Sequence, residues 1–470
     1  MSPLWTAADA ARATGGEVSG SAGWTAAGVS IDTRSLDPGD LFVALRGPNH
    51  DAHDFVATAF NRGAAAAIVD RDIAGLGETA PLLRVGDTLA GLDALGAFAR
   101  ERSNAQVVAV TGSVGKTGTK EALRLALGAC GPVFASGGSL NNHWGVPLSL
   151  ARMPSDLAYG VFELGMNHPG EIAALTRLVR PHIAVITTIA PAHLGFFRSV
   201  EEIADAKAEI FLGLQPGGVA ILNRDNPYYL RLAAAAEAAG AARILGFGAD
   251  QEAAIRLADC VLGPDGSAVE AIVAGRRLRF WLRVAGRHWV MNALAVLGAA
   301  LAAGCDLDRA AAALAELDTL PGRGCRHRLA WPGGTLTLID ESYNASPAAM
   351  QAALAVLGAT APAAGSRRVA VLGEMLELGD ASDRLHRELV VPLAAAEVDR
   401  VFLVGEHVAA LHEVLPKERR GGLWPSAQAA IPELLSFLQS GDVVMVKGSN
   451  GVRTGRIVER LLAESAKLET

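Results

Sequence analysis

The segment QVVAVTGSVGKTGTK, which spans Gln106 to Lys120, constrains the fold more than any other part of the chain. Its first part, Gln106–Thr111, is rich in valine, as is typical of a buried strand in a parallel sheet. The glycine-rich loop Thr111–Thr117 follows, and a helical pattern begins directly after it. Free N–H groups and the dipole at a helix start favour an anion there. This order of strand, loop and helix therefore predicts a phosphate-binding site in an α/β fold.

The loop predicts a role for each of its residues. The backbone of Thr111, Gly112, Ser113, Val114 and Gly115 would wrap the phosphates of a nucleotide, Lys116 would reach the β/γ-phosphates, and the Thr117 hydroxyl would bind Mg²⁺. The common P-loop has four residues between its glycines, whereas Gly112 and Gly115 enclose only two. The alternative is a tight strand-to-helix turn that binds nothing. The Gly-Lys-Thr order between a strand and a helix favours the nucleotide site.

Length and charge narrow the class of protein. A chain of 470 residues suggests about three domains of ~150 residues each. The formal net charge is 42 − 49 = −7, and we find no basic run that would follow a nucleic-acid backbone. We therefore expect small-molecule substrates and no nucleic-acid partner.

Cysteine usage and hydropathy indicate the compartment. The four cysteines are scattered without a C-x-x-C pair, which argues against a zinc ribbon or a disulfide framework and fits a reducing cytoplasm. The N-terminal residues lack the basic segment and apolar core of a signal peptide. The most apolar long run, 289–304, is shorter than the ~20 residues that a membrane helix needs. We expect a cytoplasmic protein that does not insert into a membrane.

Strand and helix patterns divide the chain into three α/β segments, 1–85, 86–318 and 319–470. The middle segment holds the phosphate loop, a β-rich insertion at 241–247 and 270–284, and a long helix that opens at 286–292. In the last segment strands alternate with helices, which predicts a doubly wound parallel sheet. No G-x-G-x-x-G motif follows its strands, so a dinucleotide site is not expected there.

Three residues of the middle segment could serve a metal. Glu163 ends a strand after the phosphate loop, where a metal-binding acid belongs. His193 follows the next strand; a lone strand-end histidine is more often structural, but its pairing with Glu163 favours a ligand. Lys207 lies beside the apolar face of a predicted helix at 203–211, where a snorkelling lysine is the alternative.

Further candidates lie in loops beside strands, where ligand contacts tend to sit. In the first segment, the arginines could instead form surface ion pairs. Asn292 could bond a base or ribose, or cap its helix locally. These candidates are Thr33, Arg34, Arg46 and His53 in the first segment, Asn292 in the second, and Asp340, Asn344 and Ser449 at strand ends of the third.

Together these motifs resemble those of the Mur ligases, the ATP-dependent amide-bond synthetases of bacterial cell-wall assembly. More narrowly, the chain is similar to the members that act on UDP-N-acetylmuramoyl-tripeptide and D-alanyl-D-alanine. The chain departs from the family at Gly118, where serine is frequent, and at Asn450, where many relatives have arginine. The similar motifs run over nearly the whole chain, at 30–34, 39–45, 111–117, 141–142, 145–147, 163–167, 170–172, 190–194, 206–207, 209–211, 286–292, 321–323, 340–347 and 447–449.

The resemblance implies an α/β protein of three domains. The first is a small α/β domain that binds the UDP end of the precursor, the second a P-loop ATPase-like parallel-sheet domain, and the third a Rossmann-like domain that brings the amine. The γ-phosphoryl group of ATP would activate the tripeptide carboxylate as an acyl phosphate, which the dipeptide amine then attacks. The implied cofactors are ATP and two Mg²⁺ ions, and the implied state is a monomer.

The resemblance also implies residue roles. Lys116 would hold the β/γ-phosphates, Thr117 and Glu163 would serve one Mg²⁺, and His193 a second. Lys207 matches a lysine that the family carbamylates, which turns an amine into a carboxylate-like metal ligand. Positions near the adenosine and phosphates are Asn292, Arg323 and Asp340; positions on the precursor side are Ser30, Thr33, Arg34, Arg46, His53, Asn141 and Asn142; Asn344 and Ser449 belong to the third domain.

Three alternative interpretations of the sequence remain. The ligase that adds the third residue carries, in its diaminopimelate-specific form, an Asp-Asn-Pro-Arg motif in its last domain, whereas here Asp225-Asn226-Pro227 lies in the middle segment before Tyr228. Folylpolyglutamate synthase lacks a first domain like residues 30–45. A P-loop NTPase switch would hydrolyse nucleotide without any amine acceptor.

Overall fold

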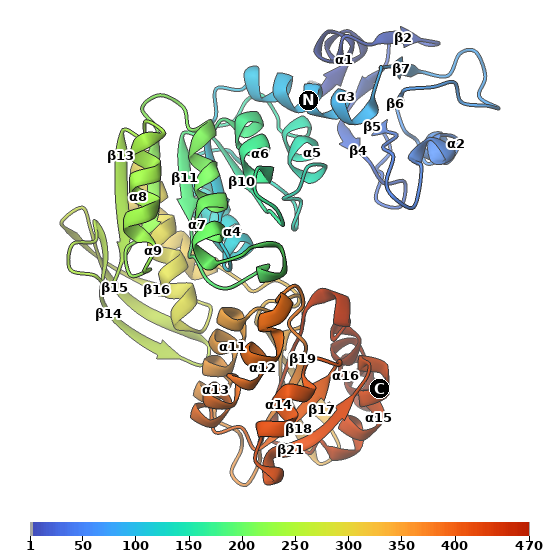
Figure 1. The fold of residues 1–470 in the computed structure, drawn as a ribbon. Helices are drawn as coiled ribbons and strands as arrows, with labels where there is room; N and C mark the ends of the chain where they lie inside the picture. Colours follow the sequence, from blue (N-terminus) through green and yellow to red (C-terminus); the bar gives the residue numbers. More distant parts are fainter. Residues whose placement is uncertain (1–2, 470) are drawn as a thin grey trace.

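The computed structural model describes residues 3–469, which form three main β-sheets with helices packed around them (Figure 1). The sheets follow one another along the chain, in blue, green to yellow, and orange to red. The predicted α/β class with three sheets is therefore confirmed. Among the described residues, none of the helices is both long and apolar enough to cross a membrane.

The first sheet has five strands in the order β2-β7-β6-β5-β4, of which only β2 runs antiparallel to its neighbour. A separate pair, β1 and β3, lies beside it. The elements are β1 (Trp5–Thr6), α1 (Ala7–Thr14), β2 (Glu17–Ser19), β3 (Thr25–Ala26), β4 (Gly28–Ser30), β5 (Asp40–Val43), α2 (Val56–Asn61), β6 (Ala66–Val69), β7 (Leu82–Arg84) and α3 (Thr88–Glu101).

Helix α3 joins the first sheet to the second. Its buried Leu92 and Leu95 pack in one cluster with Trp5 of the first segment and Leu148 of the second. The Thr88 hydroxyl donates a 2.8 Å hydrogen bond to the Ala44 carbonyl and fixes the start of the helix on the first sheet. A boundary near residue 85 therefore falls at the start of a helix that contacts both sides.

The second sheet has nine strands in the order β16-β15-β14-β13-β12-β11-β8-β10-β9. The strands from β9 to β14 are parallel, and β15 and β16 are antiparallel hairpin strands. They are β8 (Gln106–Thr111), β9 (Val133–Ala135), β10 (Tyr159–Glu163), β11 (Ile183–Ile186), β12 (Val219–Asn223), β13 (Arg243–Gly248), β14 (Ile255–Gly263), β15 (Gly266–Val273) and β16 (Arg276–Leu282).

The expected β-rich insertion is part of this sheet. Strand β14 pairs with β13 in parallel, and the β15–β16 hairpin strands extend the same edge. The insertion joins the sheet because β13 would otherwise be an edge strand. Its free N–H and C=O groups pair with the strand that follows.

Helices cover both faces of the second sheet. Two clusters of buried apolar residues, one on each face, hold them to the strands. On one face lie α4 (Lys116–Gly128), α9 (Arg287–Ala302) and α10 (Leu307–Ala313); on the other lie α5 (Gly145–Ala151), α6 (Glu171–Val179), α7 (Val200–Ala208) and α8 (Tyr229–Ala238).

The third sheet has six strands in the order β17-β18-β22-β19-β20-β21. It is doubly wound as predicted, with α11 to α14 on one face and α15 and α16 on the other. The elements are β17 (Cys325–Trp331), β18 (Gly334–Glu341), α11 (Pro347–Ala359), β19 (Arg368–Gly373), α12 (Ser382–Arg387), α13 (Val390–Ala395), β20 (Arg400–Val404), α14 (Ala409–Val414), β21 (Arg420–Trp424), α15 (Ala427–Phe437), β22 (Val443–Lys447) and α16 (Gly455–Glu469).

One edge of the third sheet differs from the predicted all-parallel arrangement. Strand β17 runs antiparallel to β18 and forms a hairpin with it. Its sequence, CRHRLAW, mixes charged and apolar residues, as is typical of an edge strand with one face in solvent. The sheet is therefore mixed, and its parallel part begins at β18.

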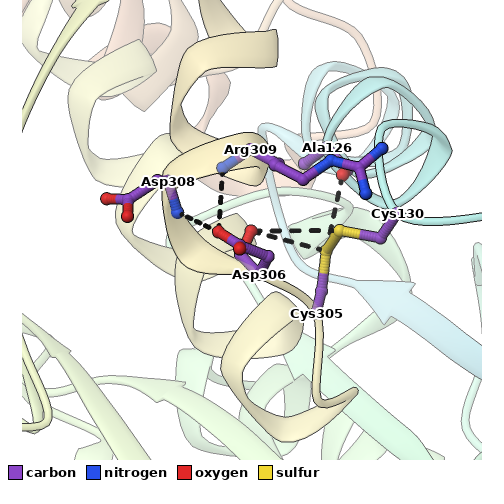
Figure 2. The surroundings of a disulfide bond; sticks show 6 residues. All are labelled: Ala126, Cys130, Cys305, Asp306, Asp308 and Arg309. Carbon is purple, nitrogen blue, oxygen red and sulfur yellow. Dashed lines mark hydrogen bonds between the residues drawn. A yellow bond between two sulfur atoms is a disulfide. The ribbon is translucent and has the colours of Figure 1, made fainter.

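A disulfide joins Cys130, just after α4, to Cys305, between α9 and α10 (Figure 2). The expectation that no cysteines pair is therefore wrong for these two, while Cys260 and Cys325 are free. Their sequence separation of 175 residues gave no local signal. They meet because α4 and α9 pack on the same face of the second sheet.

Candidate active site

The phosphate loop starts at the centre of the second sheet. Strand β8 lies between β10 and β11, and all three are parallel. Glu163 is level with Val110, and Ile186 is level with Thr111. Because parallel strands end at the same edge of a sheet, Glu163 and the loop after β11 open onto the phosphate loop. The expectation that Glu163 and His193 follow strands beside the loop strand is confirmed.

Two glycines set the conformation of the phosphate loop. Gly112 has a φ of 150° and Gly115 a φ of 87°, both in the region that favours glycine. A Cβ on Gly112 would collide with the Thr187 hydroxyl, and a Cβ on Gly115 would lie 3.0 Å from Oδ1 of Asn292. Because both positions are glycine, the loop can pass close to the side chains of Thr187 and Asn292.

Polar contacts hold the loop in place. The Ser113 hydroxyl donates to the Ala190 carbonyl at 2.9 Å and accepts the Ala190 N–H at 3.0 Å. Lys116 Nζ donates to the Gly112 carbonyl at 2.9 Å, so the side chain folds back across the loop. Gly115 precedes the first residue of α4, so the helix begins within the loop. This is the cradle of N–H groups and positive charge that a phosphate needs.

Glu163 gathers oxygen and amide groups beside the loop. It is 1% exposed. Its Oε2 accepts the Thr117 hydroxyl at 2.8 Å and its Oε1 accepts Nδ2 of Asn141 at 2.7 Å. A hydroxyl and a carboxylate oxygen in contact are hard ligands of the kind that Mg²⁺ prefers.

Among residues 3–469, no group of three or more His, Cys, Asp and Glu side chains could hold a metal ion. Mg²⁺ is usually held by one or two carboxylates together with substrate phosphates, not by an all-protein cage. Thr117 and Glu163 fit that pattern.

Two lysines of this part of the chain have lowered pKa values, the half-buried Lys116 beside Glu163 and the buried Lys207 beside Lys116. Burial lowers the pKa of Lys116; the Glu163 charge opposes this shift and the Arg323 charge adds to it. Burial, and then the charge of Lys116, lower the pKa of Lys207 well below its usual value. Lys207 is 1% exposed, and within residues 3–469 its Nζ has no hydrogen-bond or ion-pair partner. Burial of this kind favours the neutral form of an amine over the charged form.

His193 lies where the second and third sheets meet. Its Nδ1 is 2.5 Å from Oε2 of Glu377, which belongs to the loop after β19. The hydrogen bond from His193 is the largest cause of a lowered pKa of Glu377, while burial opposes that shift. Both residues line the cavity described next.

A cavity of 790 Å³ lies between the second and third sheets. It brings together most of the predicted ATP and metal residues and two residues of the third segment. The predicted residues that line it are Ser113, Val114, Gly115, Lys116, Thr117, Asn141, Glu163, His193, Asn292, Arg323, Asn344 and Ser449.

Five predicted residues support this wall without lining the cavity. Thr111 donates to the Leu164 carbonyl at 2.8 Å, beneath the loop, and Gly112 lies against Thr187. Lys207 is buried and does not line the cavity. Asp340, 5% exposed, accepts the Gly322 N–H at 2.8 Å and so holds the turn that carries Arg323. The Asn142 side chain accepts N–H groups at the start of α5.

The first-segment candidates lie outside this cavity. The Arg34 guanidinium pairs with Asp32 at 2.6 Å, and Arg46 pairs with Asp70 at 2.6 Å, so the ion-pair alternative describes both in this structure. Arg62 donates to the Thr33 carbonyl at 2.9 Å, and Ser30 is fully buried. Arg34 and Arg46 remain exposed enough to meet a ligand.

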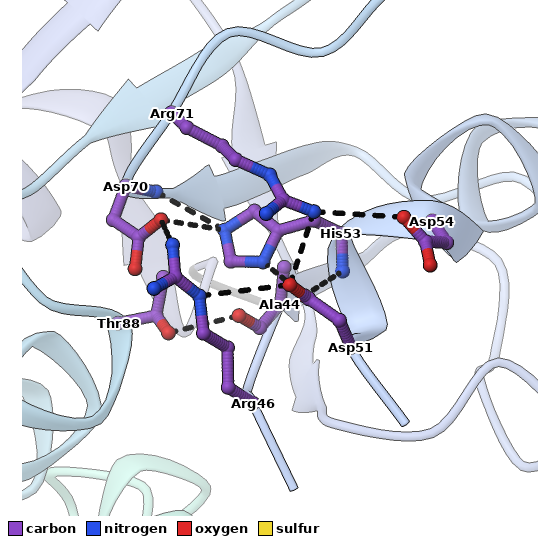
Figure 3. Close-up of polar contacts among 8 residues, drawn as sticks. All are labelled: Ala44, Arg46, Asp51, His53, Asp54, Asp70, Arg71 and Thr88. Carbon is purple, nitrogen blue, oxygen red and sulfur yellow. Dashed lines mark hydrogen bonds and ion pairs between the residues drawn. The ribbon is translucent and has the colours of Figure 1, made fainter. Parts of the chain in front are cut away.

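His53 lies beside Asp51 and Asp70, the two carboxylates that pair with Arg46 (Figure 3). It is 2% exposed. Its Nε2 accepts the Asp70 N–H at 3.2 Å, so Nδ1 carries the proton and bonds Asp51 at 2.6 Å. Both nitrogens are used within the protein. Neither ring nitrogen of His53 is therefore left for a direct contact with a ligand in this structure.

Four further polar residues at the cavity edge were not singled out from the sequence. Lys447 Nζ donates to Oε2 of Glu341 at 3.0 Å and to the Asn344 carbonyl at 3.1 Å. Ser139 accepts from Arg323 at 3.2 Å, and Glu377 bonds His193. Lys447 and Glu341 end adjacent parallel strands, the signal that identified Glu163. Ser139 and Glu377 lie in loops and gave no pattern.

The Trp289 ring leaves no room for a side chain at Gly118, and this makes a testable prediction. A Cβ at Gly118 would lie 2.6 Å from the Trp289 ring. Gly118→Ser is expected to lower the free energy of unfolding by about 1–3 kcal/mol, because overpacking outweighs a gain in helix propensity of about 0.5 kcal/mol. Urea unfolding would measure it.

The control for this substitution is Gly118→Ser in a Trp289→Phe background. The smaller ring leaves room for the Cβ, so the loss caused by serine is expected to shrink. An equal stability of Gly118→Ser and the natural chain would contradict the steric explanation.

Comparisons with known proteins agree with this site. Three family profiles match, described as Mur ligase middle domain at residues 110–300, Mur ligase glutamate ligase domain at 327–450, and Mur ligase family catalytic domain at 25–100. The UDP-N-acetylmuramoyl-tripeptide–D-alanyl-D-alanine ligase of Rickettsia prowazekii is 34% identical, with 97% of this chain and 99% of that protein covered.

Two solved structures are similar over most of their length. MurF from Acinetobacter baumannii has a TM-score of 0.85 and 31% identity, with 98% of this chain and 99% of that chain covered. The MurF ligase of Thermotoga maritima in complex with ADP has a TM-score of 0.76 and 28% identity, with 94% and 98% covered. The chain belongs to the Mur ligase family.

Proposed function

We propose that this chain joins D-alanyl-D-alanine to the terminal carboxylate of UDP-N-acetylmuramoyl-tripeptide at the expense of ATP. The observation that carries the proposal is the cavity in which Lys116, Thr117 and Glu163 face residues of the third sheet. A site that couples a nucleotide to an acceptor needs both in one space. Curated relatives of nearly the full length carry the name of this ligase.

ATP fits the second sheet. The phosphate loop and Lys116 would hold its phosphates, with Arg323 reaching them from the third segment and Asn292 near the adenosine. Asp340 would act through the turn that it holds. The solved relative from Thermotoga maritima carries ADP, which supports this assignment.

The donor set fits Mg²⁺. Thr117 and Glu163 would hold one ion, and His193 with a modified Lys207 would serve a second. Bound Mg²⁺ neutralises the phosphate charge that would otherwise repel an incoming carboxylate.

Lys207 would carry a carbamate. Its neutral Nζ would attack the carbon of CO₂, forming an N–C bond while one C=O π bond opens onto oxygen and one proton leaves the nitrogen, so that the neutral amine becomes an anion. The buried, unpartnered amine supports this chemistry. A carbamate reaches farther than an aspartate and presents two oxygens, the ligands that Mg²⁺ prefers.

The reaction needs two steps because a carboxylate is a poor electrophile. A carboxylate oxygen of the tripeptide first attacks the γ-phosphorus of ATP; the bond to the β–γ bridging oxygen breaks and ADP leaves. The dipeptide amine then attacks the acyl carbon, loses a proton, and the tetrahedral intermediate expels phosphate. Lys116 stabilises the negative charge that builds on the transferred group.

The remaining residues would place the substrates. Ser30, Thr33, Arg34, Arg46 and His53, with Asn141 and Asn142, belong to the precursor side, and Asn344 and Ser449 to the dipeptide side. We assign residues 1–85 to the UDP-precursor domain, 86–318 to the ATP domain and 319–470 to the C-terminal domain. We also propose that the enzyme works as a monomer in the cytoplasm.

One assay tests the function and separates it from its rivals. Purified protein with Mg²⁺, ATP and UDP-N-acetylmuramoyl-tripeptide is expected to release phosphate when D-alanyl-D-alanine is added, and not with single amino acids. Phosphate release with single amino acids but not with the dipeptide would overturn the specific assignment. Release that ignores any amine would indicate an NTPase switch instead.

A further inference from the structure

The second and third sheets meet at two short loops, one from each. On the second sheet, His193 precedes the 3₁₀ turn η2 (Leu194–Phe196). On the third, Glu377 precedes the turn η5 (Gly379–Ala381) by two residues. The Gly195 N–H donates to the Glu377 carbonyl at 2.8 Å, and Leu194 packs against the apolar cores of both sheets. The loops therefore form one connected contact.

The backbone at this contact is unusual on both sides. His193 has a φ of 58° and Glu377 a φ of 63°, a region that non-glycine residues rarely adopt. A Cβ on Gly379 would lie 3.1 Å from the Gly195 Cα, so the two loops approach closely. Residues in rarely adopted backbone conformations cluster at functional sites, where the surrounding structure holds them in place.

The Glu377 loop is fixed by the third sheet. The Met375 N–H donates to Nε2 of the buried His386 at 2.9 Å, and the Leu376 N–H donates to the Ser449 hydroxyl at 3.0 Å. These bonds set the position from which the Glu377 carboxylate reaches His193.

We propose that Glu377 is a positioning residue for His193, which it orients from across the boundary between the two sheets. This inference rests on the proposed role of His193 as a metal ligand. A carboxylate only accepts hydrogen bonds, so His193 Nδ1 donates to Glu377, which leaves Nε2 as the ring nitrogen for a metal. Among residues 3–469, Nε2 has no hydrogen-bond partner.

The consequence is that the proposed metal ligand, His193, belongs to the second sheet, whereas the residue that orients it, Glu377, belongs to the third. Metal-binding histidines usually donate their second N–H to a carboxylate, which fixes the ring. Here that carboxylate comes from the sheet that brings the amine. The His193 position is therefore complete only when the third sheet is docked, so metal binding at His193 depends on this contact between the sheets.

Titration with Mn²⁺ as a probe, followed by electron paramagnetic resonance with ADP present, tests the proposal. Glu377→Gln is expected to weaken the binding of one Mn²⁺ by about 10- to 100-fold, the usual cost of losing such a partner. The control Asp380→Asn removes a charge from the same loop without a contact to His193 and is expected to leave affinity unchanged. Unchanged affinity in Glu377→Gln would overturn the proposal.

A double-mutant cycle separates positioning from an independent effect. If Glu377 acts through His193, the double variant His193→Ala with Glu377→Gln binds Mn²⁺ no more weakly than His193→Ala alone. Additive losses would contradict the proposal. In metal-free protein, amide exchange at residues 193–197 is expected to be faster in Glu377→Gln than in Asp380→Asn.

These readouts separate this proposal from the proposed function. A natural chain that ligates the dipeptide, with Mn²⁺ affinity untouched by Glu377→Gln, would overturn the positioning role alone. Coupling between Glu377 and His193 in a protein that does not ligate the dipeptide would overturn the assigned reaction and leave the positioning role standing.

Discussion

Replacing Lys207 with alanine is expected to lower the rate of phosphate release by about 10²- to 10³-fold, because the site loses a charged group that neutralises the reacting anions. Acetate or bicarbonate added to the Lys207→Ala enzyme is expected to restore part of the rate, since a small carboxylate fits the space that the side chain leaves. Steady-state phosphate release with the full substrate set measures both effects.

The physical basis is the state of the Lys207 amine. Its pKa is lowered by burial and by Lys116, so it stays neutral at pH values where an exposed lysine is charged. Only a neutral amine reacts with CO₂ to form a carbamate. Labelling with ¹³CO₂ is therefore expected to give a carbamate signal in the natural chain that disappears in Lys207→Ala.

The chain offers a matched control in Lys120, which is also fully buried. Lys120 Nζ donates to the carbonyls of Ser136 at 2.7 Å and Gly138 at 2.8 Å and pairs with Glu121 at 2.9 Å. All three protons have partners, so no carbamate is expected there. Lys120→Ala should lose stability, and acetate should not restore its activity. Full activity in Lys207→Ala would remove the carbamate from the mechanism.

The second large effect is expected for Lys116→Met, with a loss in kcat of about 10²- to 10³-fold, because a methionine of similar length cannot stabilise charge on the transferred phosphoryl group. The same change is expected to keep or raise the free energy of unfolding without ligand, by up to about 1 kcal/mol. Burial lowers the pKa of Lys116, which means that the charged form is disfavoured in the folded protein.

Activity and stability should therefore move in different directions. Rates from phosphate release and urea unfolding of the ligand-free protein would show this. Lys116→Arg keeps the charge but changes its shape and is also expected to be impaired, because the two side chains differ in hydrogen-bond geometry. A stability loss as large as the activity loss in Lys116→Met would indicate a structural role instead.

Much of the nucleotide half of the site could be predicted because its signals are local. The valine-rich strand, the short glycine loop and the helix start lie within fifteen residues, and β8 begins and ends where the pattern indicates. Glu163 is predictable because the strand ends of a parallel sheet share an edge. That rule needs only the order of elements along the chain.

The rest depends on contacts between distant segments. Cys130 and Cys305 pair only because α4 and α9 pack together, and no spacing rule covers such a distance. His53 is polar and lies in a loop, yet it is buried because Asp51 and Asp70 use both its nitrogens. Glu377 meets His193 across two sheets, at a sequence separation of 184 residues. Loop positions of this kind follow from the docking of sheets, which the local pattern does not encode.

The disulfide also changes the covalent topology of the molecule. It closes a ring that contains the strands from β9 to β16 and leaves the first and third sheets outside it as two tails. A protease that cuts once in the exposed turn between β14 and β15 would open this ring without separating the pieces. On a denaturing gel the nicked chain would migrate as one species until a reductant was added. The disulfide would keep the two halves of the ATP site covalently linked. A cut outside the ring would give two pieces with no covalent link between them.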